Sequence, residues 1–131
     1  MNMKSANGMV YFETTDGEQK VMKLDFNAIA DLEALLGMGI GSLVNDENVG
    51  FNIIRGFYWA GLKFRDRGLT VEQAGNFIQS EIAGGKSFED LMVPVTEALI
   101  ASGIIDRADV EDAEEGMDFD DAEASEEDPK N

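Results

Sequence analysis

The chain opens with two short runs in which apolar and polar residues sit close to alternation. These runs are residues 9–14 (MVYFET), which are rich in β-branched and aromatic residues, and residues 19–25 (QKVMKLD), which alternate imperfectly. Between them lies an Asp16-Gly17 pair, and Gly accepts the positive φ that a tight turn requires. The pattern therefore predicts an N-terminal antiparallel β-hairpin.

From Asp25 onward the apolar residues recur at the spacing of an α-helix. A first helix should begin at Asp25 or Phe26 and end at Gly37, and residues 37–41 should form a stop and tight turn. A second helix is expected over residues 49–66. It carries two apolar rows and should be central, packed on two sides. The rows predicted to be buried are Phe26, Ile29, Leu32, Leu35 and Leu36 in the first helix, and Phe51, Ile53, Ile54, Phe57, Tyr58, Ala60, Leu62 and Phe64 in the second.

Two further helices are marked by their capping residues. Thr70 and Gln73 fit a capping box ahead of a helix that ends at Gly84-Gly85, and Ser87 should cap a last helix reaching Gly103. Pro94 is expected to kink or divide that last helix. Their predicted buried faces are Val71, Ala74, Phe77, Ile78 and Ile82, then Phe88, Leu91, Met92, Val95 and Leu99.

Charge divides the chain into two parts. The 131 residues hold 27 Asp+Glu against 10 Lys+Arg, a net charge of −17. Residues 1–105 carry 14 acids and 8 bases, whereas residues 106–131 carry 13 acids and 2 bases. The second part has too few apolar residues to offset its chain entropy, so disorder is expected there. The sequence thus predicts an α+β, mainly α fold: a compact domain over 1–105, with an N-terminal hairpin and about four helices, and a disordered acidic C-terminal tail over 106–131.

Composition argues against several kinds of function. A net negative chain is repelled by phosphate, so neither nucleic acid nor an anionic membrane surface is an expected partner. The sequence has no Cys and no His, which leaves no thiol and removes the commonest general base and metal ligand. The acidic run over residues 118–123 lacks the Gly and flanking helices of a calcium-binding EF-hand loop. We therefore expect a non-enzymatic protein without cofactor, metal or catalytic residues. With no signal-like or membrane-spanning apolar stretch, it should stay in the cytoplasm.

The one candidate binding site lies on the second helix. Trp59 projects from the middle of its polar sector, where either another element covers it or a partner contacts it. Because Trp and Arg dominate binding hot spots, the second alternative makes Trp59 an interface anchor with Arg55 and Lys63 at its rim. The candidate partner-binding residues are Arg55, Tyr58, Trp59 and Lys63.

Three segments together resemble a known family. They are residues 26–37 (FNAIADLEALLG), which follow the hairpin, residues 58–63 (YWAGLK) and residues 69–75 (LTVEQAG). In order and spacing they are similar to the tail assembly chaperones of long-tailed bacteriophages and gene-transfer agents. The resemblance covers roughly residues 9–103, and it places Trp59 in a segment that belongs to the shared fold.

The resemblance implies a protein that binds the tape measure protein, and also tail tube subunits, and keeps them soluble until the tail is built. It further implies a longer frameshifted form of the chain as a partner, no catalytic residues, and absence from the finished particle. Two alternatives remain open. One is a small acidic inhibitor or DNA mimic, although a mimic needs its carboxylates in an ordered array. The other is a minor structural tail or connector component.

Overall fold

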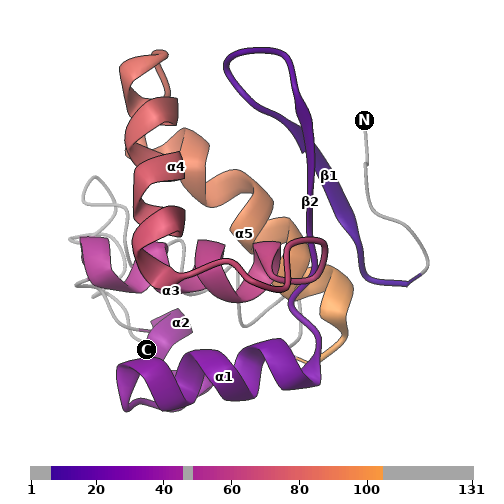
Figure 1. Cartoon of the computed structure of the whole chain (residues 1–131). Helices are drawn as coiled ribbons and strands as arrows, with labels where there is room; N and C mark the ends of the chain where they lie inside the picture. Colours follow the sequence, from indigo (N-terminus) through magenta and orange to yellow (C-terminus); the bar gives the residue numbers. More distant parts are fainter. Residues whose placement is uncertain (1–6, 46–48, 105–131) are drawn as a thin grey trace, which may run out of the picture.

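The protein is an α+β, mainly helical fold, as the sequence predicts. The computed structural model describes residues 7–45 and 49–104, and Figure 1 shows the hairpin standing beside the helices. The residues predicted to form an acidic tail lie outside this part of the chain. The elements are β1 (Val10–Glu13), β2 (Gln19–Met22), α1 (Phe26–Leu36), α2 (Ile40–Asn45), α3 (Phe51–Leu62), α4 (Val71–Ala83) and α5 (Phe88–Ser102).

The predicted hairpin is confirmed. Strands β1 and β2 pair antiparallel, with Val10 opposite Met22 and Glu13 opposite Gln19. The turn closes through a hydrogen bond of 2.7 Å from the Thr14 N–H to the Glu18 carbonyl oxygen. Gly17 has a φ of +91°, which explains why Gly is needed at this position of the turn.

The helix ends follow the capping residues. Asp25 accepts a hydrogen bond from the Ala28 N–H at 2.9 Å, and α1 ends at Gly37 with a φ of +71°. Both predicted capping boxes are formed, at the N-termini of α4 and α5. In the second box, hydrogen bonds from the Ser87 backbone and hydroxyl hold the pKa of Asp90 below its ordinary value.

Three predictions about helices need correction. Helix α3 is shorter than residues 49–66, and the turn predicted over 37–41 gives way to a short helix, α2, at Ile40. The Glu33 carboxylate accepts a hydrogen bond from the Ile40 N–H at 2.7 Å, which satisfies a free donor at the start of α2. Pro94 does not divide the last helix, because α5 continues through it and buries it in the core.

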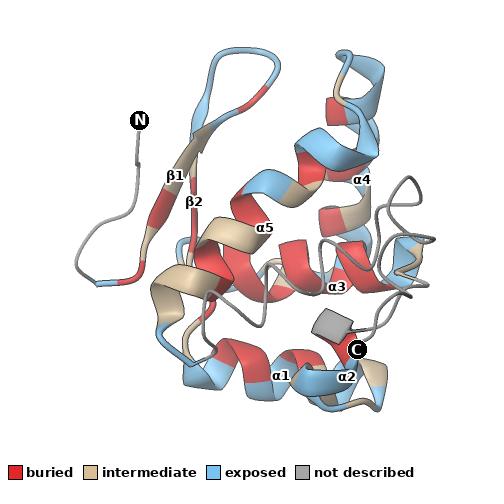
Figure 2. Cartoon of the chain, turned by 180° about the vertical axis from the view of Figure 1, so that it is seen from behind, coloured by how far each residue is buried: buried red, intermediate tan, exposed pale blue. Residues whose placement is uncertain are grey.

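Helix α3 is the central element, as its two apolar rows predict. Figure 2 shows buried residues along most of its length, and α1, α4, α5 and β2 all contact it. Two glycines bring neighbours unusually close. A Cβ at Gly56 would lie 2.8 Å from Leu32 Cδ1, and one at Gly61 would overlap the Met22 side chain. The close approach at Gly61 also lets its carbonyl oxygen accept a hydrogen bond of 3.1 Å from the Lys23 N–H.

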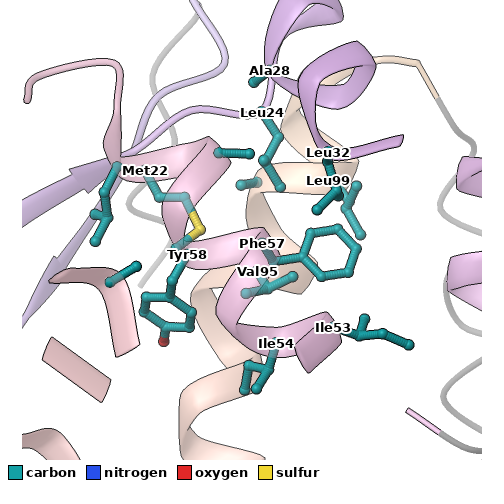
Figure 3. Close-up of a cluster of buried hydrophobic side chains, with 14 of the residues drawn as sticks. Met22, Leu24, Ala28, Leu32, Ile53, Ile54, Phe57, Tyr58, Val95 and Leu99 are labelled. Carbon is teal, nitrogen blue, oxygen red and sulfur yellow. The ribbon is translucent and has the colours of Figure 1, made fainter. Parts of the chain in front are cut away.

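The core joins the hairpin to every long helix. Its largest fully buried side chains include Met22 at the end of β2, Leu24 just after β2, Leu32 in α1, Tyr58 in α3 and Val95 in α5. Figure 3 shows several of these side chains converging around Phe57 and Tyr58. Because one continuous cluster contains residues of β1, β2 and all five helices of the described part of the chain, these residues form one domain.

Candidate functional site

The predicted binding residues follow one another along α3 at four-residue spacing, except Tyr58. Trp59 is half-buried, and its indole Nε1–H donates a hydrogen bond of 3.1 Å to the Leu69 carbonyl oxygen. Leu69 precedes α4, so this bond holds the α3–α4 loop against α3. The element that covers part of Trp59 is therefore the α3–α4 loop.

Lys63 completes this arrangement at the end of α3. Its Nζ lies 4.0 Å from the centre of the Trp59 ring and 2.7 Å from Asp31 Oδ2 in α1. A cation over an indole face is attracted by the ring electrons, and the Asp31 carboxylate fixes its position. Trp59 and Lys63 thus connect α1, α3 and the α3–α4 loop, while leaving part of both side chains at the surface.

Arg55 is exposed, one turn before Trp59. Its aliphatic stem lies against α4 at Gly75, where an added Cβ would sit 3.2 Å from Arg55 Cδ. The guanidinium end is therefore free to reach solvent while the stem covers the helix–helix contact.

Tyr58 does not belong to the candidate surface. Only 1% of the residue is exposed, and its hydroxyl donates a hydrogen bond of 2.6 Å to the Leu91 carbonyl oxygen in α5. Burial raises the pKa of the phenol above its ordinary value of 10.0, and the charge of Glu81 acts in the same direction. The correction follows from helix geometry, because neighbouring residues point about 100° apart. Tyr58 therefore faces the core while Trp59 faces the α3–α4 loop.

A buried carboxylate, which the sequence pattern did not indicate, forms the second polar feature. Glu81 of α4 is 2% exposed, and its Oε2 accepts hydrogen bonds of 3.1 Å from both the N–H and the hydroxyl of Thr15 in the hairpin turn. Lys86 Nζ lies 3.2 Å from Glu81 Oε1 in an ion pair, and it donates to the Glu13 carbonyl oxygen at 3.0 Å. Glu81 Oε1 has this ion pair but no hydrogen bond among the described residues, whereas Oε2 holds the hairpin tip against α4 through its two bonds to Thr15.

Three phenylalanines that the sequence placed on buried faces are exposed instead. Phe26, Phe51 and Phe88 have exposed fractions of 76%, 80% and 37%. Each is the first residue of its helix, in α1, α3 and α5 respectively. Side chains of a helix lean toward its N-terminus, so a side chain at the first position projects past the helix end. Each Phe lies on the helix face that the periodicity predicts, but at the first position of the helix no neighbouring element covers the side chain.

Two of these side chains meet. The ring centres of Phe51 and Phe88 lie 6.4 Å apart with planes tilted by 59°, within the usual range for an aromatic pair. We call them the Phe51–Phe88 pair. Two adjacent aromatic side chains held at helix ends provide a preformed apolar anchor point on the surface, which the helical pattern alone did not predict.

The remaining candidate chemistry finds no site in the described residues. Over residues 7–45 and 49–104, no three acidic side chains gather as a metal site would require. Nor does this part of the chain contain a helix both long and apolar enough to cross a membrane. The acidic run over 118–123 lies outside the described residues.

The fold and surface together define a small, mainly helical domain with an N-terminal hairpin and an exposed aromatic pair. Comparison with protein-family models, with curated proteins and with solved structures found no match.

Proposed function

We propose that the chain is a tail assembly chaperone, which binds the tape measure protein and keeps it soluble until the tail is assembled. The observation that carries the proposal is the Phe51–Phe88 pair, because a reversible apolar contact needs apolar side chains already exposed on a stable fold. The resemblance of residues 26–37, 58–63 and 69–75 to that family supplies the kind of partner.

The expected strength of such a contact suits a temporary complex. Fully burying an exposed Phe side chain contributes about 1.5–3 kcal/mol. Because Phe51 is 80% and Phe88 37% exposed, the pair would contribute about 2–3.5 kcal/mol. A dissociation constant near 1 μM corresponds to about −8 kcal/mol. The pair could thus supply part of micromolar binding, which tube assembly could still displace.

Charge supports the same role. The net charge of −17 opposes self-association, so the chain can expose aromatic side chains and remain dispersed. Arg55, Trp59 and Lys63 stay in the proposal as a second contact area on α3, with Tyr58 removed. Tail tube subunits and a longer frameshifted form of the chain remain further proposed partners.

The test is co-expression with the tape measure protein, scored by the amount of that protein in the soluble fraction and by co-purification. Wild type should raise both. The double variant Phe51→Gln with Phe88→Gln should lower co-purification strongly, since loss of both contacts weakens binding by about twentyfold or more. Phe26→Gln is the matched control, because Phe26 is about as exposed as Phe51 and also begins a helix.

Each result has a distinct meaning. If the tape measure protein stays insoluble while the wild-type chain elutes alone, the chaperone proposal is wrong. If co-purification occurs but only Phe26→Gln reduces it, the partner binds the end of α1 and the Phe51–Phe88 pair is not the anchor. Finding the chain in purified tail particles would instead favour a structural component.

A further inference from the structure

The basic residues of this acidic protein gather in one region. The described residues contain seven Lys and Arg. Five of these are in two short segments, 19–23 and 62–69, which hold a single acid, Asp66. The five are Lys20, Lys23, Lys63, Arg65 and Arg67.

The two segments face each other across an open cleft. Its walls are β2, with Lys20 and Val21, and the end of α3 with the following loop, while Phe77 of α4 also lines it. Of the five cations, Lys20 and Arg65 line the cleft, together with one acid, Asp66. Its volume is about 380 Å³. Figure 1 shows the loop after α3 running beside β2, where this basic cleft lies.

The cations at the cleft are held over aromatic rings and leave their charge available. In the cleft, Lys20 Nζ lies 5.7 Å from the centre of the Phe77 ring. Arg65 lies 5.7 Å from the ring of Phe64, and beside the cleft Lys23 Nζ lies 4.8 Å from the same ring. The ion pair of Lys20 with Glu18 is long, at 3.9 Å, and solvent-exposed, so it contributes little. Such a surface suits an extended acidic peptide with occasional apolar side chains.

We propose that the basic cleft binds the acidic C-terminal segment of the same chain, residues 106–131. That segment carries 13 acids and 2 bases, with Val110, Met117 and Phe119 as its large apolar residues. Opposite charge and scattered apolar residues match the cations and rings of the cleft. The inference does not depend on the proposed tape measure partner.

The chain is long enough to reach. Near the end of α5, the Ala101 carbonyl oxygen lies against Gly8, just before β1, and β1 pairs with β2. The cleft begins a few residues along β2, which at about 3.3 Å per residue is roughly 10–17 Å away. A flexible segment of about ten residues spans roughly 16–19 Å. The acids from about residue 112 onward can therefore reach the cleft within the same molecule, at an effective concentration in the millimolar range.

A spin label provides the test, because the natural sequence has no Cys and one introduced Cys is unique. In the full chain carrying Ser125→Cys with a nitroxide, amide signals around Lys20, Val21 and Arg65 should broaden at low salt. In about 1 M salt, where the screening length falls to about 3 Å, the broadening should disappear. The double variant Lys20→Gln with Arg65→Gln should show the same loss at low salt.

Arg55→Gln is the matched control, because it removes an exposed arginine of α3 that does not line the cleft, and the broadening should persist. Absence of broadening at low salt, or broadening of another surface, would overturn the inference. So would broadening seen only when isotope-labelled chains are mixed with spin-labelled ones, because the segment would then bind a second copy. All these readouts come from the chain alone, so they are separate from the tape measure assay.

Discussion

Replacing Glu81 by Ala should destabilise the fold more than any other single change of a charged residue on α4. The carboxylate accepts two hydrogen bonds of 3.1 Å from Thr15 and pairs with Lys86 at 3.2 Å. A hydrogen bond to a charged group contributes about 1.5–3 kcal/mol, and breaking a buried ion pair costs about 3–5 kcal/mol. Thr15 is exposed and Lys86 keeps its bond to Glu13, so both can rehydrate in part. We therefore expect a loss toward the lower end, about 2–4 kcal/mol.

Urea denaturation followed by circular dichroism and by the fluorescence of Trp59 measures this loss. Glu81→Gln should cost about half as much, since the amide oxygen still accepts from Thr15 while the charge is lost. Glu72→Ala serves as the control at an exposed acid of the same helix, and it should cost less than about 1 kcal/mol. The hydrogen exchange of the Thr15 N–H should accelerate only in the Glu81 variants.

One result would refute the reasoning. If Glu81→Ala lowers the free energy of unfolding by less than about 1 kcal/mol at an unchanged urea slope, the carboxylate does not hold the hairpin tip. A double-mutant cycle with Thr15→Val locates the effect. The two changes should be coupled by about 0.5–3 kcal/mol, since they remove parts of one contact.

Three other changes test the core and the candidate surface. Tyr58 keeps its proton in the folded state above its ordinary pKa of 10.0. The free energy of unfolding should therefore fall as pH rises past that value, by up to about 1.4 kcal/mol per pH unit. In urea titrations, Tyr58→Phe should flatten this pH dependence. At neutral pH the same change should cost about 1 kcal/mol. Gly61→Ala should destabilise by about 1–3 kcal/mol in thermal unfolding, because its Cβ would overlap Met22. The matched change Gly75→Ala meets only the flexible Arg55 stem, so the gain in helix propensity of about 1 kcal/mol should offset the crowding. Trp59→Ala should lower the free energy of unfolding, because the bond to Leu69 and the contact with Lys63 are both lost. A drop of about 3 kcal/mol or more would assign Trp59 to packing rather than to a binding surface.

The elements that local chemistry determines were predicted well. The hairpin followed from an Asp-Gly turn, and the starts of α4 and α5 from their capping boxes, because these signals act between residues that are close in sequence. The central position of α3 followed from its two apolar rows. Helix α2 was missed because its first free N–H is satisfied by Glu33, seven residues earlier in the chain.

The candidate surface was predicted less well, for a geometrical reason. Periodicity separates the faces of a helix, so Phe51 and Phe88 counted as buried, but it does not tell where a neighbouring element ends. It also left Tyr58 and Trp59 together as candidates, although only tertiary packing decides which of two adjacent residues faces the core. The burial of Glu81 could not be predicted from local sequence, because its partner Thr15 is 66 residues away.

The resemblance to tail assembly chaperones and the exposed surface are separate lines of support for the proposed function. Several of the matching positions serve packing: Leu32, Tyr58, Gly61 and Ala74 are all buried. These residues support a shared fold, but one fold can serve several functions. Phe51 and Phe88 lie outside the three matching segments, so their exposure does not follow from the resemblance. A variant that removes the Phe51–Phe88 pair therefore tests binding while leaving the three matching segments unchanged. If that variant no longer binds the tape measure protein, the exposed pair and the resemblance support the same function.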